Sequence, residues 1–181
     1  MRLFVGIPLP ADIRDRLALL AGGLPGARWV RPESLHVTLR FIGEVDEGQA
    51  EDIDAALAAV RAPAFPLIIA GVGCFDRGRQ VHTVWAGVDA GPAIGHLYEK
   101  VESAVVRCGL EPERRNFKAH VTLARLRGTP VSRVGEYMQT RQGIFGGPIT
   151  ADRFTLFRSH LGSEGALYEA LVDYPLDGAT A

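Results

Sequence analysis

A tetrapeptide that occurs twice is the feature that most constrains the fold of this chain. His-Val-Thr-Leu stands at residues 36–39 and again at residues 120–123, an offset of 84 in a chain of 181 residues. Two further pairs of segments keep nearly the same offset: FVGI at 4–7 with WAGV at 85–88, and VGCF at 72–75 with FTLF at 154–157. This self-similarity predicts an internal duplication, with repeat one spanning about residues 1–80 and repeat two about residues 81–181.

Hydrophobic periodicity predicts the same order of elements in each repeat: strand, helix, strand, helix, strand. The predicted helices cover residues 11–21, 50–60, 92–108 and 131–140, and the predicted strands cover 2–9, 35–42, 65–75, 81–88, 120–126, 149–157 and 167–174. Residues 28–34 are predicted to form a loop. We therefore expect an α+β fold with two pseudo-symmetric α/β lobes, antiparallel-rich sheets around a central cleft, and helices outside. No long linker separates the repeats, so residues 1–181 are expected to form a single bilobal domain.

Charge and cysteine content limit the classes of partner. Lys and Arg number 20 against 21 Asp and Glu, a formal net charge of −1, which excludes a general polyanion binder but not a local pocket for one phosphate. Cys74 and Cys108 form no C-x-x-C motif, as expected of a reduced, cytoplasmic protein. The first residues resemble neither a signal peptide nor a membrane span. We expect no membrane association, and we infer no obligate protein partner.

The residue types in the repeated tetrapeptide predict the kind of reaction that the chain catalyses. Side chains alternate along a strand, so His36 and Thr38 share one face, and His120 and Thr122 repeat the arrangement. Two imidazoles and two hydroxyls meeting in a cleft suit a tetrahedral anion. Histidine has an ordinary pKa of about 6.5, so one ring can act as a general base and the other as a general acid near neutral pH. Chance would give only about 0.2 H-x-T matches in this composition, so the pair indicates phosphodiester chemistry without a metal.

Other catalytic chemistries lack their motifs. Neither H-x-T segment carries an Asp, Glu or Cys that would complete a zinc site, and H-E-x-x-H is absent. The sequence has no G-x-S-x-G nucleophile elbow. The glycine-rich stretch 87–95 lacks the G-K-[ST] ending of a phosphate-binding loop. No cofactor is therefore expected.

Four segments carry a family resemblance that covers nearly the whole chain: RLFVGIPLP, WVRPESLHVTLRFIGEV, FKAHVTLARL and LFRSHLGSEGALYEAL. In order and spacing they resemble the RNA 2′,3′-cyclic phosphodiesterases, also called LigT-like 2′-5′ RNA ligases, of the two-histidine phosphoesterase superfamily. The resemblance implies a bilobal fold and hydrolysis of an RNA 2′,3′-cyclic phosphate end to a 2′-phosphate, with no cofactor. It also implies that His36 is the proton donor and His120 the proton acceptor, and that Thr38, Thr122 and Arg125 bind the phosphate.

Arg125 and its neighbours in the motifs raise a geometric question. Arg125 comes five residues after His120, so strict alternation places it on the opposite face unless the strand ends, twists or bulges near Ala124. Phe41 holds the equivalent position in repeat one, where it could stack on a base or belong to the core. Arg40 shares a face with His36 by alternation, and could touch the substrate or lie on the surface.

The remaining histidines and basic residues are secondary candidates. His82 and His160 lie near a turn and a strand end and could line the cleft, whereas His96 lies off the apolar stripe of its helix. Arg77 and Arg79 in one loop, and Arg114, Arg115 and Lys118 in another, are either solvated surface charges or a funnel for an RNA end.

Three alternatives to cyclic-phosphate hydrolysis stay open. An RNA ligase could run the same chemistry in reverse and form a 2′-5′ bond, and no residue distinguishes the two directions. A phosphodiesterase for a small cyclic nucleotide or cyclic sugar phosphate would use the same groups. A non-catalytic module that binds RNA ends or nucleotides would need hydrogen-bond donors but no matched acid and base.

Overall fold

The computed structural model describes residues 1–162 and 165–178, which form nine strands, four α-helices and one 3-10 turn. Their order along the chain is β1 (Arg2–Pro8), α1 (Ala11–Ala18), β2 (Ala27–Trp29), η1 (Pro32–Ser34), β3 (His36–Glu44), α2 (Glu47–Ala58), β4 (Phe65–Arg77), β5 (Gln80–Asp89), α3 (Pro92–Arg107), β6 (His120–Leu126), α4 (Val131–Arg141), β7 (Phe145–Ala151), β8 (Arg153–Gly162) and β9 (Gly165–Pro175).

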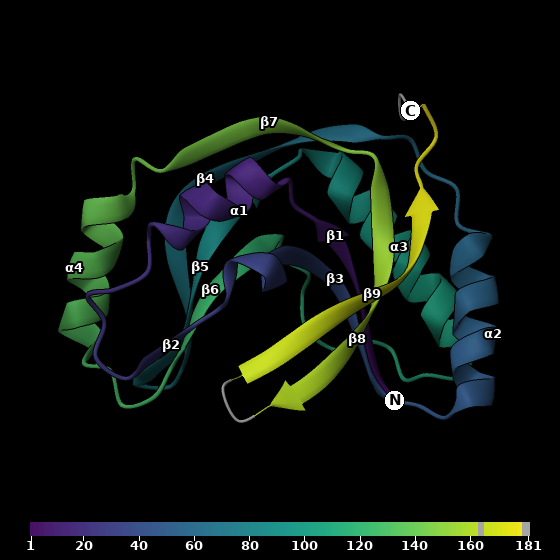
Figure 1. Ribbon diagram of the computed structural model, residues 1–181, viewed down its shortest axis with the longest axis horizontal. Coiled ribbons are helices and arrows are strands. Elements are labelled where there is room, and N and C mark those ends of the chain that lie inside the picture. The colour runs from purple at the N-terminus through teal and green to yellow at the C-terminus, as the bar shows by residue number, and fades with distance from the viewer. Residues whose placement is uncertain (163–164, 179–181) are drawn as a thin grey trace.

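All nine strands belong to one curved sheet. The strand order is β7-β4-β5-β6-β3-β1-β8-β9, with the short strand β2 paired to β6, and the strand pairings are antiparallel. β3 and β6, which carry the two H-x-T motifs, meet at the middle of this order. The fold is therefore α+β as predicted. Figure 1 shows α1 and α4 beside one half of the sheet and α2 and α3 beside the other.

The two halves of the sheet exchange strands between the predicted repeats. β4, from repeat one, pairs with β5 of repeat two, and β8, from repeat two, pairs with β1 of repeat one. The helices follow the same exchange, because α2 packs against α3, while α4 contacts β4 and β5 and α1 contacts β7. Each half of the sheet thus contains one H-x-T strand but elements of both repeats, a long-range arrangement that local sequence patterns do not reveal.

Several boundaries differ from the sequence prediction, and each difference has a local cause. The helix expected from residue 50 begins at Glu47, because the Asp46 carboxylate caps it by accepting a hydrogen bond from the Gln49 N–H at 2.8 Å. The strand expected over residues 149–157 is two strands, β7 and β8, which pair with β4 and β1 in opposite halves of the sheet. Strand β2, which overlaps the start of the expected loop 28–34, pairs with β6.

One hydrophobic core runs through both halves. Val37 and Val121, the second residues of the two tetrapeptides, are fully buried in it, as are Leu57 of α2 and Leu97 of α3. The valines anchor the central strands on the core side of the sheet. The histidine and threonine that flank each valine therefore face away from the core. In the described part of the chain, the longest helix has 16 residues, and none combines the length and apolarity that crossing a membrane requires.

Candidate active site

The H-x-T motifs form a square of polar side chains across β3 and β6. Val37 pairs directly with Val121. In this antiparallel register His36 lies beside Thr122, and Thr38 lies beside His120. The two histidines therefore occupy one diagonal of the square and the two threonines the other. The convergence predicted from alternation is confirmed, and all four side chains line one cavity.

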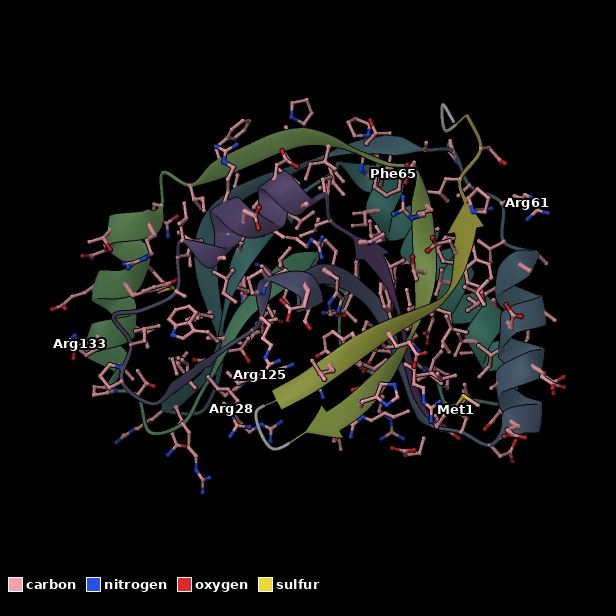
Figure 2. The ribbon with its side chains drawn as sticks, viewed as in Figure 1. Met1, Arg28, Arg61, Phe65, Arg125 and Arg133 are labelled. Atoms are coloured by element: carbon pink, nitrogen blue, oxygen red, sulfur yellow. The ribbon has the colours of Figure 1, made fainter. Side chains whose placement is uncertain are left out.

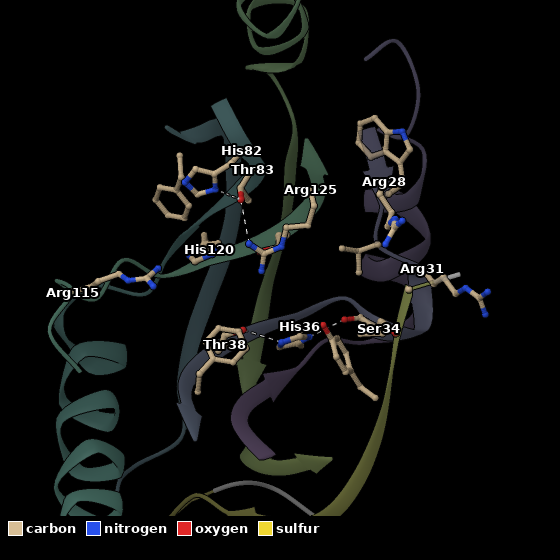
Figure 3. A pocket seen from close by; sticks show the side chains of 18 residues that line it. Arg28, Arg31, Ser34, His36, Thr38, His82, Thr83, Arg115, His120 and Arg125 are labelled. Carbon is tan, nitrogen blue, oxygen red and sulfur yellow. Dashed lines mark hydrogen bonds between the residues drawn. The ribbon is translucent and has the colours of Figure 1, made fainter. Parts of the chain in front are cut away.

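Backbone carbonyls fix the tautomer of both histidines. Nδ1 of His36 lies 2.7 Å from the Ser34 carbonyl oxygen, and Nδ1 of His120 lies 2.7 Å from the Lys118 carbonyl oxygen. A carbonyl oxygen only accepts, so each Nδ1 carries a proton and donates it. In the neutral ring Nε2 then carries no proton and can accept one. Nε2 of His36 lies 2.9 Å from Oγ1 of Thr38, whose hydroxyl donates to it (Figure 3).

Aromatic side chains hold each imidazole in place. His36 packs against Phe4 and Phe157, with ring centroids 4.7 and 5.8 Å away, and meets Tyr168 edge-on at 5.1 Å. His120 meets Phe75 edge-on at 4.9 Å and lies 6.1 Å from Trp85. Phe4 matches Trp85, and Phe157 matches Phe75, in the segment pairs FVGI/WAGV and VGCF/FTLF of the sequence. The repeated segments thus build equivalent walls around the two histidines.

Both histidines are poor proton acceptors in the free protein. Burial, together with the charges of His120 and Arg125, lowers the pKa of His36 to about 4, against the opposing effect of the Ser34 carbonyl. Burial also lowers the pKa of His120, as do Arg125 and Lys118. Both lowered pKa values therefore favour the neutral rings at pH 7, unlike the neutral and protonated pair expected from ordinary histidine pKa values. A bound anion would favour the protonated rings.

A bulge in each central strand decides which later residue faces the cavity. In the β1–β3 pairing, Val5 opposes Arg40 and Gly6 opposes Thr38, so Leu39 is an extra residue in β3. In the β5–β6 pairing, Val84 opposes Ala124 and Trp85 opposes Thr122, so Leu123 is the extra residue in β6. Both extra residues are the leucines of the repeated tetrapeptide. Alternation shifts by one after each bulge, which turns Phe41 and Arg125 onto the face of the histidines.

The same bulge overturns the expectation for Arg40. Its side chain turns away from the cavity and is buried, with Nε 2.5 Å from Glu102 Oε2 and Nη1 3.8 Å from Glu113 Oε2. The guanidinium also donates to the carbonyls of Phe41, at 2.7 Å, and of Glu111. Arg40 does not line the cavity, so the prediction of a substrate contact was wrong for this residue.

Arg125 is held at the cavity wall by a buried threonine. Its Nη1 donates to Oγ1 of Thr83 at 3.2 Å, and Nδ1 of His82 lies 2.9 Å from the same oxygen. Thr83 is only 1% exposed. The bulge near Ala124 that a phosphate contact by Arg125 would need is present.

The cavity has a volume of about 320 Å³ and a strongly cationic wall. Besides Arg125 it is lined by Arg28, Arg31 and Arg115, and no carboxylate appears among its described lining residues. Arg28 lies directly opposite Arg125 in the β2–β6 pairing, and Figure 2 shows the two side by side. Arg115 approaches from the other side (Figure 3). In a protein of net charge −1, this local excess of positive charge favours an anionic ligand.

Sequence reasoning found part of this wall and missed the rest. His82 and Arg115 line the cavity, whereas His160 pairs with Glu169 at 2.7 Å on the surface and His96 is exposed. Arg28, Arg31, Ser34, Thr83 and Tyr168 also line it and were not singled out. No motif marks these residues in the sequence, because the fold brings them to the cavity. The segment of β2 and η1 places the first three beside β6 and β3. Thr83 comes from β5, and Tyr168 comes from the hairpin β8–β9. Within residues 1–162 and 165–178, no group of three or more His, Cys, Asp and Glu is placed to hold a metal ion.

Comparisons with known proteins agree with this geometry. The sequence profile of the family described as LigT like Phosphoesterase matches residues 7–85 and 88–168. The chain is 32% identical over 165 residues to the RNA 2′,3′-cyclic phosphodiesterase of Aeropyrum pernix, covering 90% of this chain and 92% of that protein. It is 29% identical over 187 residues to the protein of the same name from Thermotoga maritima, covering 98% and 97%.

Solved structures are similar over almost the full chain. A crystal structure from Thermus thermophilus superposes with a TM-score of 0.81 at 26% identity, covering 99% of this chain and 100% of that one. The crystal structure of E. coli LigT complexed with 3′-AMP superposes with a TM-score of 0.78 at 27% identity, covering 97% and 98%.

Proposed function

The chain belongs to the LigT like phosphoesterase family, and on that premise we propose that it is a phosphoric diester hydrolase that opens RNA 2′,3′-cyclic phosphate ends to 2′-phosphomonoesters. The observation that carries this proposal is the square of two histidines and two threonines in a cationic cavity. The described residues that line this cavity include no Asp or Glu. Acid and base stand on opposite corners of the square, as an in-line displacement at phosphorus requires. The proposed partner is an RNA end or oligonucleotide with a 2′,3′-cyclic phosphate.

The proposed reaction uses one proton transfer at each histidine. Nε2 of neutral His120 takes a proton from water as the water oxygen bonds to phosphorus. The bond between phosphorus and the ribose 3′-oxygen breaks, and Nε2 of protonated His36 gives its proton to that oxygen. The Thr38 and Thr122 hydroxyls and the Arg125 guanidinium hold the non-bridging oxygens, where charge grows in the transition state. No metal enters this proposal.

His36 must acquire its proton before it can act as the acid. Its pKa is about 4 in the free protein because the ring is buried beside positive charge. The substrate phosphate brings a negative charge into the cavity, which favours the imidazolium. We therefore propose that substrate binding, rather than bulk pH alone, charges His36.

A short RNA ending in a 2′,3′-cyclic phosphate tests the proposal. We expect conversion to a nearly pure 2′-phosphate, seen by phosphorus NMR and by resistance of the product to a 3′-specific phosphatase. A dominant 3′-phosphate would reverse the roles of His36 and His120, and no conversion would overturn the hydrolase. Turnover that EDTA abolishes and zinc or manganese restores would contradict the metal-free mechanism. We place this activity in the cytoplasm, in keeping with the free thiols of Cys74 and Cys108.

A further inference from the structure

The residue two positions before each motif histidine differs between the repeats, although its carbonyl plays the same role. The Ser34 carbonyl accepts the Nδ1 proton of His36, and the Lys118 carbonyl accepts that of His120, both at 2.7 Å. The offset of 84 that relates the two tetrapeptides also relates these two residues. Ser34 is small and only 5% exposed, whereas Lys118 carries a long charged side chain at the surface.

The backbone around the two carbonyls differs in the same way. Ser34 belongs to the 3-10 turn η1, where its N–H donates to the Arg31 carbonyl at 2.9 Å. The local hydrogen bond therefore fixes this residue through its own backbone. Residues 110–119, which lead into β6, form neither helix nor strand. The Lys118 carbonyl thus needs a support that its own segment does not supply.

The side chain of Lys118 supplies this support. Its Nζ lies 4.8 Å from the centroid of the Trp85 ring, within the range of a cation–π contact. The ring of Trp85 is itself fixed on β5, because it lies over Gly73 of β4, where a Cβ atom would come within 2.2 Å of it. Phe75 packs against the same ring, with centroids 5.4 Å apart. The ammonium therefore ties residue 118 to a rigid part of the sheet.

We propose that Lys118 is a positioning residue for His120. Its ammonium, held on the Trp85 ring, fixes the carbonyl that keeps a proton on Nδ1 of His120, and so leaves Nε2 to accept the proton from water. This inference rests on the proposed function, in which His120 is the base, and adds the residue that orients it. Lys118 acts through its carbonyl on His120, and the mechanism asks for no contact between its ammonium and the phosphate.

The tautomer of His120 tests the proposal independently of turnover. Long-range ¹H–¹⁵N NMR of the free protein in mildly alkaline buffer, where both lowered pKa values favour neutral rings, shows which nitrogen of each ring carries the proton. Lys118→Met keeps an unbranched side chain without the charge, and should give a mixture of both tautomers at His120 while His36 stays protonated at Nδ1. Lys118→Arg keeps a cation that stacks on Trp85, and should retain the single tautomer.

Kinetics on an RNA cyclic phosphate give the second readout. A cation–π contact at an exposed site accounts for a roughly two- to fivefold effect, so Lys118→Met should lower kcat by that factor and leave KM unchanged. Lys118→Arg should keep the wild-type kcat.

Lys100→Met provides a matched control. Lys100 is the other of the two lysines in the chain and is exposed on α3, beside a separate hollow, so its loss should change neither the tautomer nor kcat. An unchanged His120 tautomer in Lys118→Met would overturn the proposal. A raised KM with unchanged kcat would also overturn it, because Lys118 would then bind the substrate directly. A mixed tautomer in a protein that hydrolyses no cyclic phosphate would support the positioning of His120 and refute the proposed reaction.

Discussion

Val37 of β3 lies directly opposite Val121 of β6, and these two buried residues are the midpoints of both H-x-T motifs. Their pairing sets the two histidines on opposite corners of a square above them, and the two threonines on the other two corners. Neither repeat completes this square alone. The two central strands must pair in this register before an acid and a base can face the same phosphorus atom.

His36→Ala and His120→Ala should each lower kcat on an RNA cyclic phosphate by roughly 10²–10⁴-fold. The double variant should be little slower than either single variant, because acid and base act in one transition state. Steady-state kinetics, with circular dichroism to check folding, measures this. His160→Ala changes an exposed histidine outside the cavity and should retain full activity. A single variant that kept more than about a tenth of kcat would lose its assigned role.

The lowered pKa of His36 should make the protein less stable in acid. The pKa falls from 6.5 in the unfolded chain to about 4 in the folded protein, so the unfolded chain binds the proton first as pH falls. The contribution of neutral His36 to the free energy of unfolding is complete above pH 6.5 and is lost between pH 6.5 and 4. From pH 7 to 4.5 the loss is about 2–3 kcal/mol. Urea unfolding should show a smaller loss in His36→Gln, whereas His96→Gln, at an exposed helix position, should behave as the wild type does.

Anion binding should reverse this shift and draw protons into the cavity. At pH 6 His36 is largely neutral in the free protein, and burial lowers the pKa of His120 as well. Binding of a nucleoside 2′-monophosphate adds negative charge and should raise both, so protons are taken up from the buffer. Calorimetric titrations in two buffers with different ionisation enthalpies measure that uptake. Uptake that persists undiminished in the His36→Gln, His120→Gln double variant would place the titrating group elsewhere.

The polar face of the site was predictable because a strand has a side-chain period of two. His36, Thr38, His120 and Thr122 share a face for that reason, and the repeat placed both motifs in equivalent strands. The α+β class also followed from the alternating patterns. That residues 1–181 form a single bilobal domain with repeats divided near residue 80 stays a prediction.

What escaped prediction depends on long-range pairing. Nothing in the leucines at 39 and 123 signals a bulge, yet the two bulges exclude Arg40 from the cavity and admit Arg125. Arg28 reaches the site only because β2 adds to the edge of β6. The exchange of β4 and β8 between the halves likewise depends on contacts between distant segments, for which local propensity carries no information.

Thr83→Val should lower kcat/KM by about tenfold without removing any group that touches the phosphate. The hydroxyl anchors Arg125 at 3.2 Å and lies 2.9 Å from Nδ1 of His82, and hydrogen bonds to charged groups contribute about 1.5–3 kcal/mol. Valine keeps the volume of the buried side chain. Thr129→Val is the matched control, because Thr129 is buried and donates to the Pro25 carbonyl at 2.6 Å, outside the cavity. Equal loss of activity in both variants would make the effect one of general stability.

Arg40→Met should destabilise the protein by about 3 kcal/mol, because it leaves a buried carboxylate without its cation. Glu102 is 16% exposed and lies 2.5 Å from the Arg40 guanidinium, while its other oxygen accepts the Glu113 N–H at 2.7 Å. Methionine keeps much of the apolar stem, so the charge is the main loss. Replacing Glu102 by Gln as well should recover part of the stability. Arg153→Met removes a 42%-exposed arginine from its contacts with Asp152 and Asp173 and should cost less than about 1 kcal/mol.

Arg40→Met should also weaken catalysis, because Arg40 holds the segment of residues 111–118 in place. The guanidinium joins Phe41 of β3 to Glu111 and Glu113, and that segment continues into Arg115 at the cavity wall and Lys118, whose carbonyl orients His120. Freeing the segment should raise KM and lower kcat together, since both an arginine and the base histidine lose their support. The double variant with Glu102→Gln separates the two effects. If it regains stability but not activity, Arg40 positions the segment; if both return together, Arg40 acts on stability alone.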